Sequence, residues 1–461
     1  MVEIPRWFDR QTARPLIRIG APIVFTQFSS TAMSFVDAWM VGALGPEQLA
    51  AILPAGLLYF IAISLVLGAH HTVNTFVSQC YGQSRSRDCG VYTWQAIWMS
   101  VGFSILLLPA YFTPPAFFEW FGHSPAVAAL ERDYFTVSIL GAVFLLCNLA
   151  LANFFIGIQR PRIPMLAAFI ALGLNVFLNW VLIYGKLGAP QLGLAGAAWG
   201  TLIANAFQTG FLFIWFTTKS IRIRFSTAKA RWRRKEFCNL VRIGLPSGIQ
   251  SLIELTAWGV VLVWFIGHFG TVDLAATTII VRYMHLSFLP LLGLGGALTA
   301  LVGQALGAED WNYAQKLTRT AIALGGSYIL IFCSCFILFR EPLVMLFTSE
   351  SAIIVLASNL ILIIAILEIG FTAQLIYGSA LRAAGDTAWI ARWTFGLCVL
   401  VMGAGGILCI TVFPHFGSFG PWGFTTLYIL TLGALFTIRW HTGGWRHVQL
   451  FSARNDTETT G

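Results

Sequence analysis

Three carboxylates stand within long apolar stretches of this sequence. They are Asp37, in "STAMSFVDAWMVGALG", Glu254 and Glu368. A carboxylate near the centre of a bilayer costs on the order of 3 kcal/mol, and burial favours its neutral, protonated form. Groups in such surroundings bind and release protons or hold cations, so we treat all three as candidate ion-binding residues. The alternative is a structural carboxylate that is hydrogen-bonded between helices.

Polar side chains in a later stretch are suitable partners for Asp37. In "LGLNVFLNWVLIYG", Asn175 and Asn179 are four residues apart, which places both amides on one face of a helix. Two amides on one face of a helix in lipid need polar partners. Either the two asparagines serve a functional site, or they only form hydrogen bonds between helices. Thr201 lies in "GLAGAAWGTLIANAF", whose small residues permit close approach of another helix.

The elements that must position these residues are long apolar helices. The chain is 57% hydrophobic and only 10% charged, whereas a soluble domain carries about 25% charged residues. Segments of roughly 20 apolar residues recur along the whole chain, and each is long enough to cross a bilayer. Lipid forces such segments to be helical, because it offers the backbone no hydrogen-bond partner. We therefore predict an all-α membrane protein with about twelve transmembrane helices.

The distribution of positive charge predicts the orientation. With both termini in the cytoplasm, all but four of the 28 Lys and Arg fall on the cytoplasmic side; the four are Arg132, Lys186, Arg282 and Arg340. This bias is typical of cytoplasmic loops. The densest basic run, 219–237, indicates an anchor on anionic lipid and not a nucleic-acid site. We predict a multi-pass protein of the cell's inner, cytoplasmic membrane, with the lipid bilayer and no nucleic acid as partner.

The two halves of the chain resemble each other. Three short motifs return after 224 or 225 residues: "IGAP" (19–22) as "IGLP" (243–246), "GALGPEQLAA" (42–51) as "GHFGTVDLAA" (267–276), and "VSQCYG" (77–82) as "VGQALG" (302–307). This indicates duplication. Six spans in each half give both halves the same orientation, which predicts two pseudo-symmetric six-helix lobes around a central cavity. The expected parts are an N-terminal lobe (1–218), a basic connection (219–237), a C-terminal lobe (238–440) and a cytoplasmic tail (441–461).

The motifs resemble those of the multidrug and toxic compound extrusion (MATE) family of secondary transporters. The resemblance covers about 16–440 and rests on "VDAWMVGALG", "VSQCYGQ", the stretch 175–201 and "ALRAAGDT" at 380–387. It implies two six-helix lobes and export of small organic compounds, often cationic or amphipathic, in exchange for H+ or Na+. We expect a monomer that uses no cofactor and holds no other metal.

The resemblance also implies roles for single residues. Asp37 matches the acidic residue of the family's first helix, and Asn175, Asn179 and Thr201 match its polar partners. We expect cation coupling at these four residues, with H+ favoured over Na+; Asp37 is also the candidate Na+ site.

The C-terminal half departs from the family pattern. Glu254 matches the acidic residue of the seventh helix, but Phe371 stands where the tenth helix commonly has a carboxylate. Glu368, about one turn earlier, is the candidate to compensate for it. Gln374 does match, and Phe371 and Gln374 are candidates for lining the cavity.

Two other functions compete with export. A flippase for lipid-linked precursors is the main alternative, because related two-lobe folds do that work, but the spans contain no basic cluster. An enzyme is not expected, because the sequence has no nucleotide-binding, metalloprotease or hydrolase motif. An aspartyl protease would need two facing carboxylates, and Asp37 is the one intramembrane Asp. The eight Cys are scattered and predict neither a disulfide framework nor a metal site.

Overall fold

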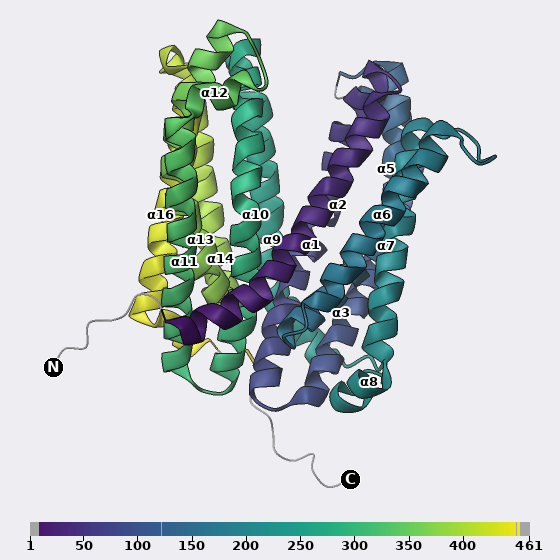
Figure 1. Cartoon of the computed structure of the whole chain (residues 1–461), viewed down its shortest axis with the longest axis vertical. Coiled ribbons are helices and arrows are strands. Elements are labelled where there is room, and N and C mark those ends of the chain that lie inside the picture. The colour runs from purple at the N-terminus through teal and green to yellow at the C-terminus, as the bar shows by residue number, and fades with distance from the viewer. Residues whose placement is uncertain (1–8, 121, 449, 452–461) are drawn as a thin grey trace, which may run out of the picture. The chain divides into compact units, whose positions relative to one another are not determined.

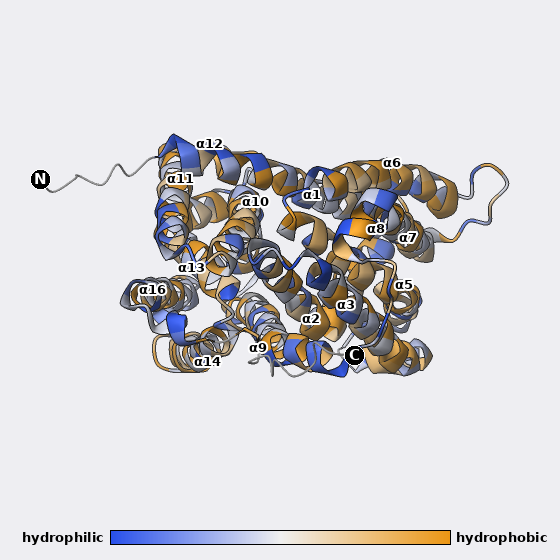
Figure 2. Cartoon of the chain, turned by 90° about the horizontal axis from the view of Figure 1, so that it is seen from below, coloured by the Kyte–Doolittle hydropathy of each residue, from blue (hydrophilic) through white to orange (hydrophobic). Residues whose placement is uncertain are grey.

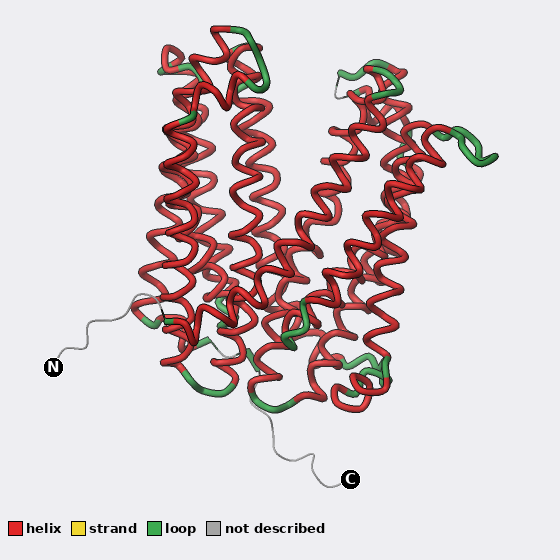
Figure 3. The backbone as a smooth tube through the Cα atoms, in the orientation of Figure 1, coloured by secondary structure: helices red, strands yellow, loops and turns green. Residues whose placement is uncertain are grey.

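The described part of the chain is entirely helices and connections. A computed structural model describes residues 9–120, 122–448 and 450–451 (Figure 1). These residues contain no strand (Figure 3), which confirms the predicted all-α class.

The helices of the first half have the following bounds: α1 (Arg10–Gly42), α2 (Pro46–Gly82), α3 (Ser86–Leu107), η1 (Leu108–Phe112), α4 (Pro115–Glu119), α5 (Pro125–Gly157), α6 (Arg162–Tyr184), α7 (Gly193–Thr217) and α8 (Lys219–Phe225). The second half contains α9 (Arg234–Gly259), η2 (Val260–Phe265), η3 (Gly267–Phe269), α10 (Thr271–Gly307), α11 (Trp311–Leu338), α12 (Arg340–Met345), α13 (Ser351–Ala383), α14 (Thr387–Leu397), η4 (Cys398–Gly403), α15 (Ala404–Thr411), η5 (Pro414–Phe416), α16 (Phe419–Thr442) and η6 (Gly444–His447).

Eleven helices of the described residues are long and apolar enough to cross a membrane. The seventh predicted span falls on α9, which is not among them because polar residues such as Gln250 and Glu254 lower its hydropathy. Large apolar side chains stay exposed on the spans, among them Trp39, Leu53, Leu106, Ile214 and Leu400. Figure 2 shows hydrophobic residues along most of α6. Such surfaces suit lipid and not water, so the chain is a multi-pass membrane protein.

Local sequence signals set several helix ends. Ser124 caps α5 by accepting a hydrogen bond from the Val127 amide, and Pro125 occupies the first helical position. Asp310 caps α11 in the same way, accepting from the Tyr313 amide. Gly185 ends α6 with a φ of 66°, a left-handed conformation that glycine adopts without strain.

The internal repeat is visible in the helices themselves. The matching helices α2 and α10 are both 37 residues long, and α5 and α13 are both 33. In the first half α5 packs against α2 and α7, and in the second half α13 packs against α10 and α16. The two halves therefore share one packing plan, as a duplicated chain requires.

The described residues form two compact units. The N-terminal unit is Pro22–Gly248, and the C-terminal unit is the described chain up to Ala21 and from Ile249 onward. Both divisions fall inside helices, one in α1 and one in α9. The lobe boundaries expected from the sequence remain predictions, and the predicted tail 441–461 extends beyond the described residues.

Candidate functional site

Asp37 lies on α1 and is buried inside the N-terminal unit, with only 5% of the residue exposed. Two side chains donate hydrogen bonds to its carboxylate. Asn179 Nδ2, from α6, lies 2.5 Å from Oδ1, and Thr201 Oγ1, from α7, lies 2.8 Å from Oδ2. The carboxylate therefore joins three helices at one point.

Asn175 completes a closed ring of hydrogen bonds. Its Nδ2 donates to Thr201 Oγ1 over 3.1 Å, and its Oδ1 accepts from Asn179 Nδ2 over 3.3 Å. Both asparagines are fully buried, and their i, i+4 spacing places them on one face of α6. We call Asp37, Asn175, Asn179 and Thr201 the Asp37 ring.

Within the described residues, hydrogen bonds and not a cation hold the Asp37 carboxylate. No Lys, Arg or His forms an ion pair with this carboxylate among the described residues. One acceptor of the ring is unused, because Asn179 Oδ1 is buried and has no hydrogen-bond partner in the described chain. The ring therefore holds a buried carboxylate beside a spare acceptor.

Close packing of α6 against α7 positions the ring. A Cβ at Gly200, one residue before Thr201, would collide with Asn179 Oδ1. Only glycine leaves room for the Asn179 side chain at this crossing. The hydroxyl of Tyr184, at the end of α6, also donates to the Met40 carbonyl of α1 over 2.8 Å, so α6 is tied to both neighbours.

In the C-terminal unit, Glu254 and Glu368 have different partners from those of Asp37. Glu254, on α9, is half-buried and accepts a hydrogen bond from Gln250 Nε2 over 3.1 Å. The Arg382 guanidinium, on α13, also interacts electrostatically with it. The sequence shows Arg382 only as part of a motif, and nothing in that motif marks it as a countercharge.

Glu368 lies midway along α13, is 2% exposed and accepts a 2.6 Å hydrogen bond from Ser287 Oγ of α10. Ser287 could not be predicted from the sequence, because a single serine in an apolar helix carries no positional signal. Phe371 stacks on Phe288 with ring centroids 4.0 Å apart. Gln374 is buried, and its Oε1 has no hydrogen-bond partner in the described part of the chain.

A family comparison identifies the chain. The sequence model of the MatE family matches residues 22–181 and again 246–404, together more than half of the chain. The protein belongs to the MATE family. The two matches begin 224 residues apart, which is the offset of the internal repeat, so each half of this MATE protein is one copy of the family unit.

Curated relatives cover nearly the whole of this MATE chain. The multidrug resistance protein MdtK of Proteus mirabilis is 29% identical over 437 residues, covering 92% of this chain and 93% of the relative. The probable multidrug resistance protein NorM of Agrobacterium fabrum is 28% identical over 450 residues, covering 94% of each chain.

Solved structures share the fold. The eukaryotic MATE transporter AtDTX14 has a TM-score of 0.84 at 19% identity, covering 95% of this chain and 97% of its own. A MOP superfamily transporter from Pyrococcus furiosus has a TM-score of 0.83 at 19% identity, with the same coverage. At this identity the likeness shows the two-lobe MATE fold alone.

Proposed function

We propose that this protein is a secondary antiporter that exports small organic compounds from the cell in exchange for protons that bind at Asp37. The observation that carries the proposal is the Asp37 ring, a buried carboxylate with no ion-pair partner in the described residues, held by three helices of one unit. Intramembrane ionisable groups of this kind serve ion pathways far more often than structure alone.

The ring supports a response to protonation. An ionised carboxylate only accepts hydrogen bonds, and the bonds from Asn179 and Thr201 serve both of its oxygens. A carboxyl group protonated on Oδ2 must donate there, and Thr201 Oγ1 can accept that proton only if its own hydroxyl proton turns to another acceptor. The bond from Asn179 to Oδ1 can remain. Protonation at Asp37 therefore reverses the hydrogen bond that joins α1 to α7.

The donor arrangement favours protons over Na+. A hard cation is bound by several oxygens, whereas an amide nitrogen and a hydroxyl proton face Asp37 here. Na+ at this position would require Asn179 to turn its nitrogen away.

Coupling of proton binding to substrate export needs only that the proton bind one conformation of the protein better than the other. Relatives named as multidrug resistance proteins support a substrate range of small organic compounds. The positive-inside pattern supports a cytoplasmic membrane location with both termini inside. Organic cations are the first compounds to test, because the family resemblance favours them.

Transport in everted membrane vesicles tests the proposal. A panel of cationic dyes is supplied outside, and a proton gradient with an acidic lumen or a Na+ gradient is imposed separately. We expect dye accumulation with the proton gradient alone, and its loss in Asp37→Asn. Asp133→Asn, at an exposed carboxylate of the same unit, serves as the matched control and should transport normally. Full proton-driven transport by Asp37→Asn, or transport driven only by Na+, would contradict the proposed coupling.

A further inference from the structure

One face of α10 carries exposed polar residues that have no part in the proposed proton coupling. Thr278, Arg282 and His285 are all exposed and belong to the C-terminal unit. Their spacing of four and three residues places them on one face of the helix. We call these three residues the Arg282 stripe. The stripe is unexpected, because α10 is apolar enough to cross a membrane.

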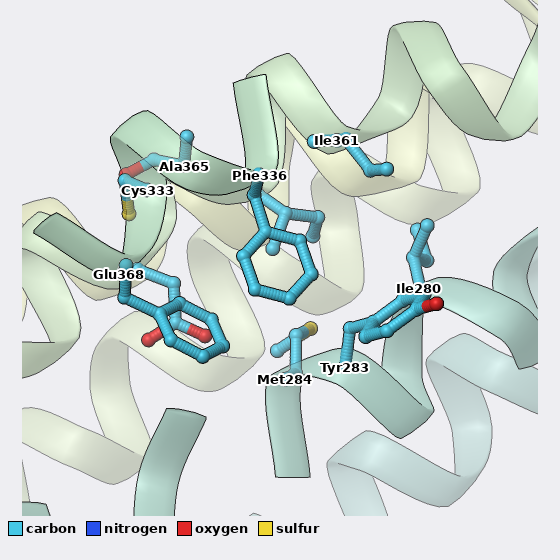
Figure 4. A pocket seen from close by; sticks show the side chains of 10 residues that line it. Ile280, Tyr283, Met284, Cys333, Phe336, Ile361, Ala365 and Glu368 are labelled. Atoms are coloured by element: carbon cyan, nitrogen blue, oxygen red, sulfur yellow. The ribbon is translucent and has the colours of Figure 1, made fainter. Parts of the chain in front are cut away.

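The opposite face of α10 is packed inside the unit. Ile280 and Met284 line a small internal cavity together with residues of α11 and α13 (Figure 4). At about 100° per residue, both positions lie about 160° around the helix from Arg282. The Arg282 stripe therefore points away from the packed interior, and the described chain leaves it uncovered.

Arg282 has no partner in the described part of the chain, where it forms neither an ion pair nor a hydrogen bond. A guanidinium group stays charged in proteins and presents five N–H donors. Charged side chains in membrane-spanning helices face polar surroundings or a partner of opposite charge. Arg282 therefore needs water or an anionic ligand.

The carboxylates of α10, α11 and α13 are engaged elsewhere. Asp273, in the first turn of α10, accepts a hydrogen bond from the Ser418 amide over 3.1 Å. Glu368 of α13 accepts from Ser287, which is buried. Neither carboxylate neutralises Arg282, so the positive charge of the stripe is available to a ligand.

His285 extends the polar surface toward the middle of α10. It lies about 21 Å from the start of a helix that is about 55 Å long. Its Nδ1 donates to the Val281 carbonyl over 2.9 Å, and its Nε2 has no hydrogen-bond partner among the described residues. A long arginine side chain can reach lipid headgroups from within a bilayer, but an imidazole is too short to do so. The stripe therefore suits water or a polar ligand better than acyl chains.

The matching helix of the first half has no such stripe. Because α2 and α10 are both 37 residues long and begin at 46 and 271, the three positions of the stripe correspond in α2 to apolar residues, namely Leu53, Leu57 and Phe60. Leu53 is 77% exposed and Phe60 is 46% exposed. The duplicated scaffold therefore forms with an apolar surface here, and the polar stripe serves a purpose of the second half alone.

The chemistry of the stripe points to an acid group as its ligand. A guanidinium group binds a carboxylate through two parallel hydrogen bonds, a geometry that no other side chain offers. Phe288 stacks on Phe371 and lies 6.4 Å from the His285 ring, which adds an aromatic surface beside the stripe. We propose that Arg282 binds the carboxylate group of amphipathic compounds that this protein exports. The inference rests on the proposed export function and adds an acid group to the features of its substrates.

Equilibrium binding of two matched dyes tests the inference. The probes are a zwitterionic rhodamine with a free carboxylate and its cationic methyl ester, which differ only at the acid group. Fluorescence anisotropy measures their binding to the full-length protein in lipid nanodiscs, without an ion gradient. We expect Arg282→Gln to weaken binding of the carboxylated dye at least about tenfold, because a charge-assisted pair is lost. Binding of the ester should not change.

Two further variants serve as references. Arg282→Lys keeps the charge but loses the planar fork, so its affinity for the carboxylated dye should lie between those of wild type and Arg282→Gln. Arg392→Gln removes an exposed arginine from α14 of the same unit. It is the matched control and should bind both dyes as wild type does.

Two results would overturn the proposal. Equal affinity of wild type and Arg282→Gln for the carboxylated dye would mean that Arg282 only reaches lipid phosphate. An equal loss of affinity for both dyes would mean that Arg282 does not recognise the acid group. If Arg282→Gln does not fold, competition on wild type replaces it: benzoate should displace the carboxylated dye more strongly than benzamide, and equal displacement would contradict the assignment.

The binding measurement is independent of transport. A protein that distinguishes the two dyes through Arg282 but exports neither would contradict the proposed antiport and not the recognition of the acid group. A protein that exports the ester but binds the carboxylated dye without help from Arg282 would give the converse result.

Discussion

Thr201 is the member of the Asp37 ring that both donates and accepts. Its hydroxyl donates to Asp37 and accepts from Asn175. Thr201→Val removes both bonds with little change of volume. A hydrogen bond to a charged group contributes about 1.5–3 kcal/mol, so we expect proton-driven dye transport to fall at least about tenfold. Initial transport rates in everted vesicles measure this. Thr201→Ser keeps the hydroxyl and should retain transport, while a fully active Thr201→Val would show that the ring is not needed.

Glu254 and Arg382 are a second pair to test at the residue scale, because the carboxylate and the guanidinium attract each other. We expect the double variant, Glu254→Gln with Arg382→Gln, to lose less thermal stability than the two single variants lose in sum. Coupling energies between interacting residues are about 0.5–3 kcal/mol. Thermal unfolding in detergent measures each variant.

The control pair for that cycle is Glu350→Gln with Arg382→Gln, whose effects should add. Additive losses for Glu254 and Arg382 would mean that these charges are not coupled, and Glu254 would then become a stronger candidate for cation binding.

At the scale of elements, the crossing of α6 and α7 decides the geometry of the ring. Gly200→Ala places a methyl group against Asn179 Oδ1, and overpacking of this kind costs about 1–3 kcal/mol. We expect both a lower unfolding temperature and a loss of dye transport. Gly210→Ala, in the same helix with open space around the new methyl group, should change neither. Normal transport by Gly200→Ala would show that Asn179 tolerates displacement.

At the scale of the whole molecule, the charge bias predicts which ends of the helices face the cytoplasm. Cys238 is exposed near the start of α9, directly after the basic connection 219–237. In a Cys335→Ser background, we expect a membrane-impermeant maleimide to label Cys238 in everted vesicles and not in intact cells. Cys335 is the other exposed cysteine, and the remaining six are buried.

The opposite side supplies the control for orientation. Lys186→Cys, in a predicted external connection, should be labelled in intact cells once Cys238 is replaced by Ser. Labelling of Cys238 from outside would reverse the predicted topology.

The fold class could be predicted from the composition of the sequence and from its internal repeat. Lipid allows a spanning backbone few solutions, so long apolar runs predict helices with little dependence on their neighbours. The repeated motifs likewise predict two similar halves, and the equal lengths of α2 and α10, and of α5 and α13, agree with them. These signals are local or periodic along the chain, which is why they can be read before any contact is known.

Only the tertiary structure distinguishes the carboxylates from one another. In the sequence, Asp37, Glu254 and Glu368 are equivalent: each is a costly charge in an apolar run. Their difference comes from partners far along the chain, namely the Asp37 ring, Arg382 for Glu254, and a lone serine for Glu368. Helical spacing shows which residues share a face, but the packing of helices determines what that face meets. The environment that sets how each carboxylate holds its charge is therefore a property of the packed helices.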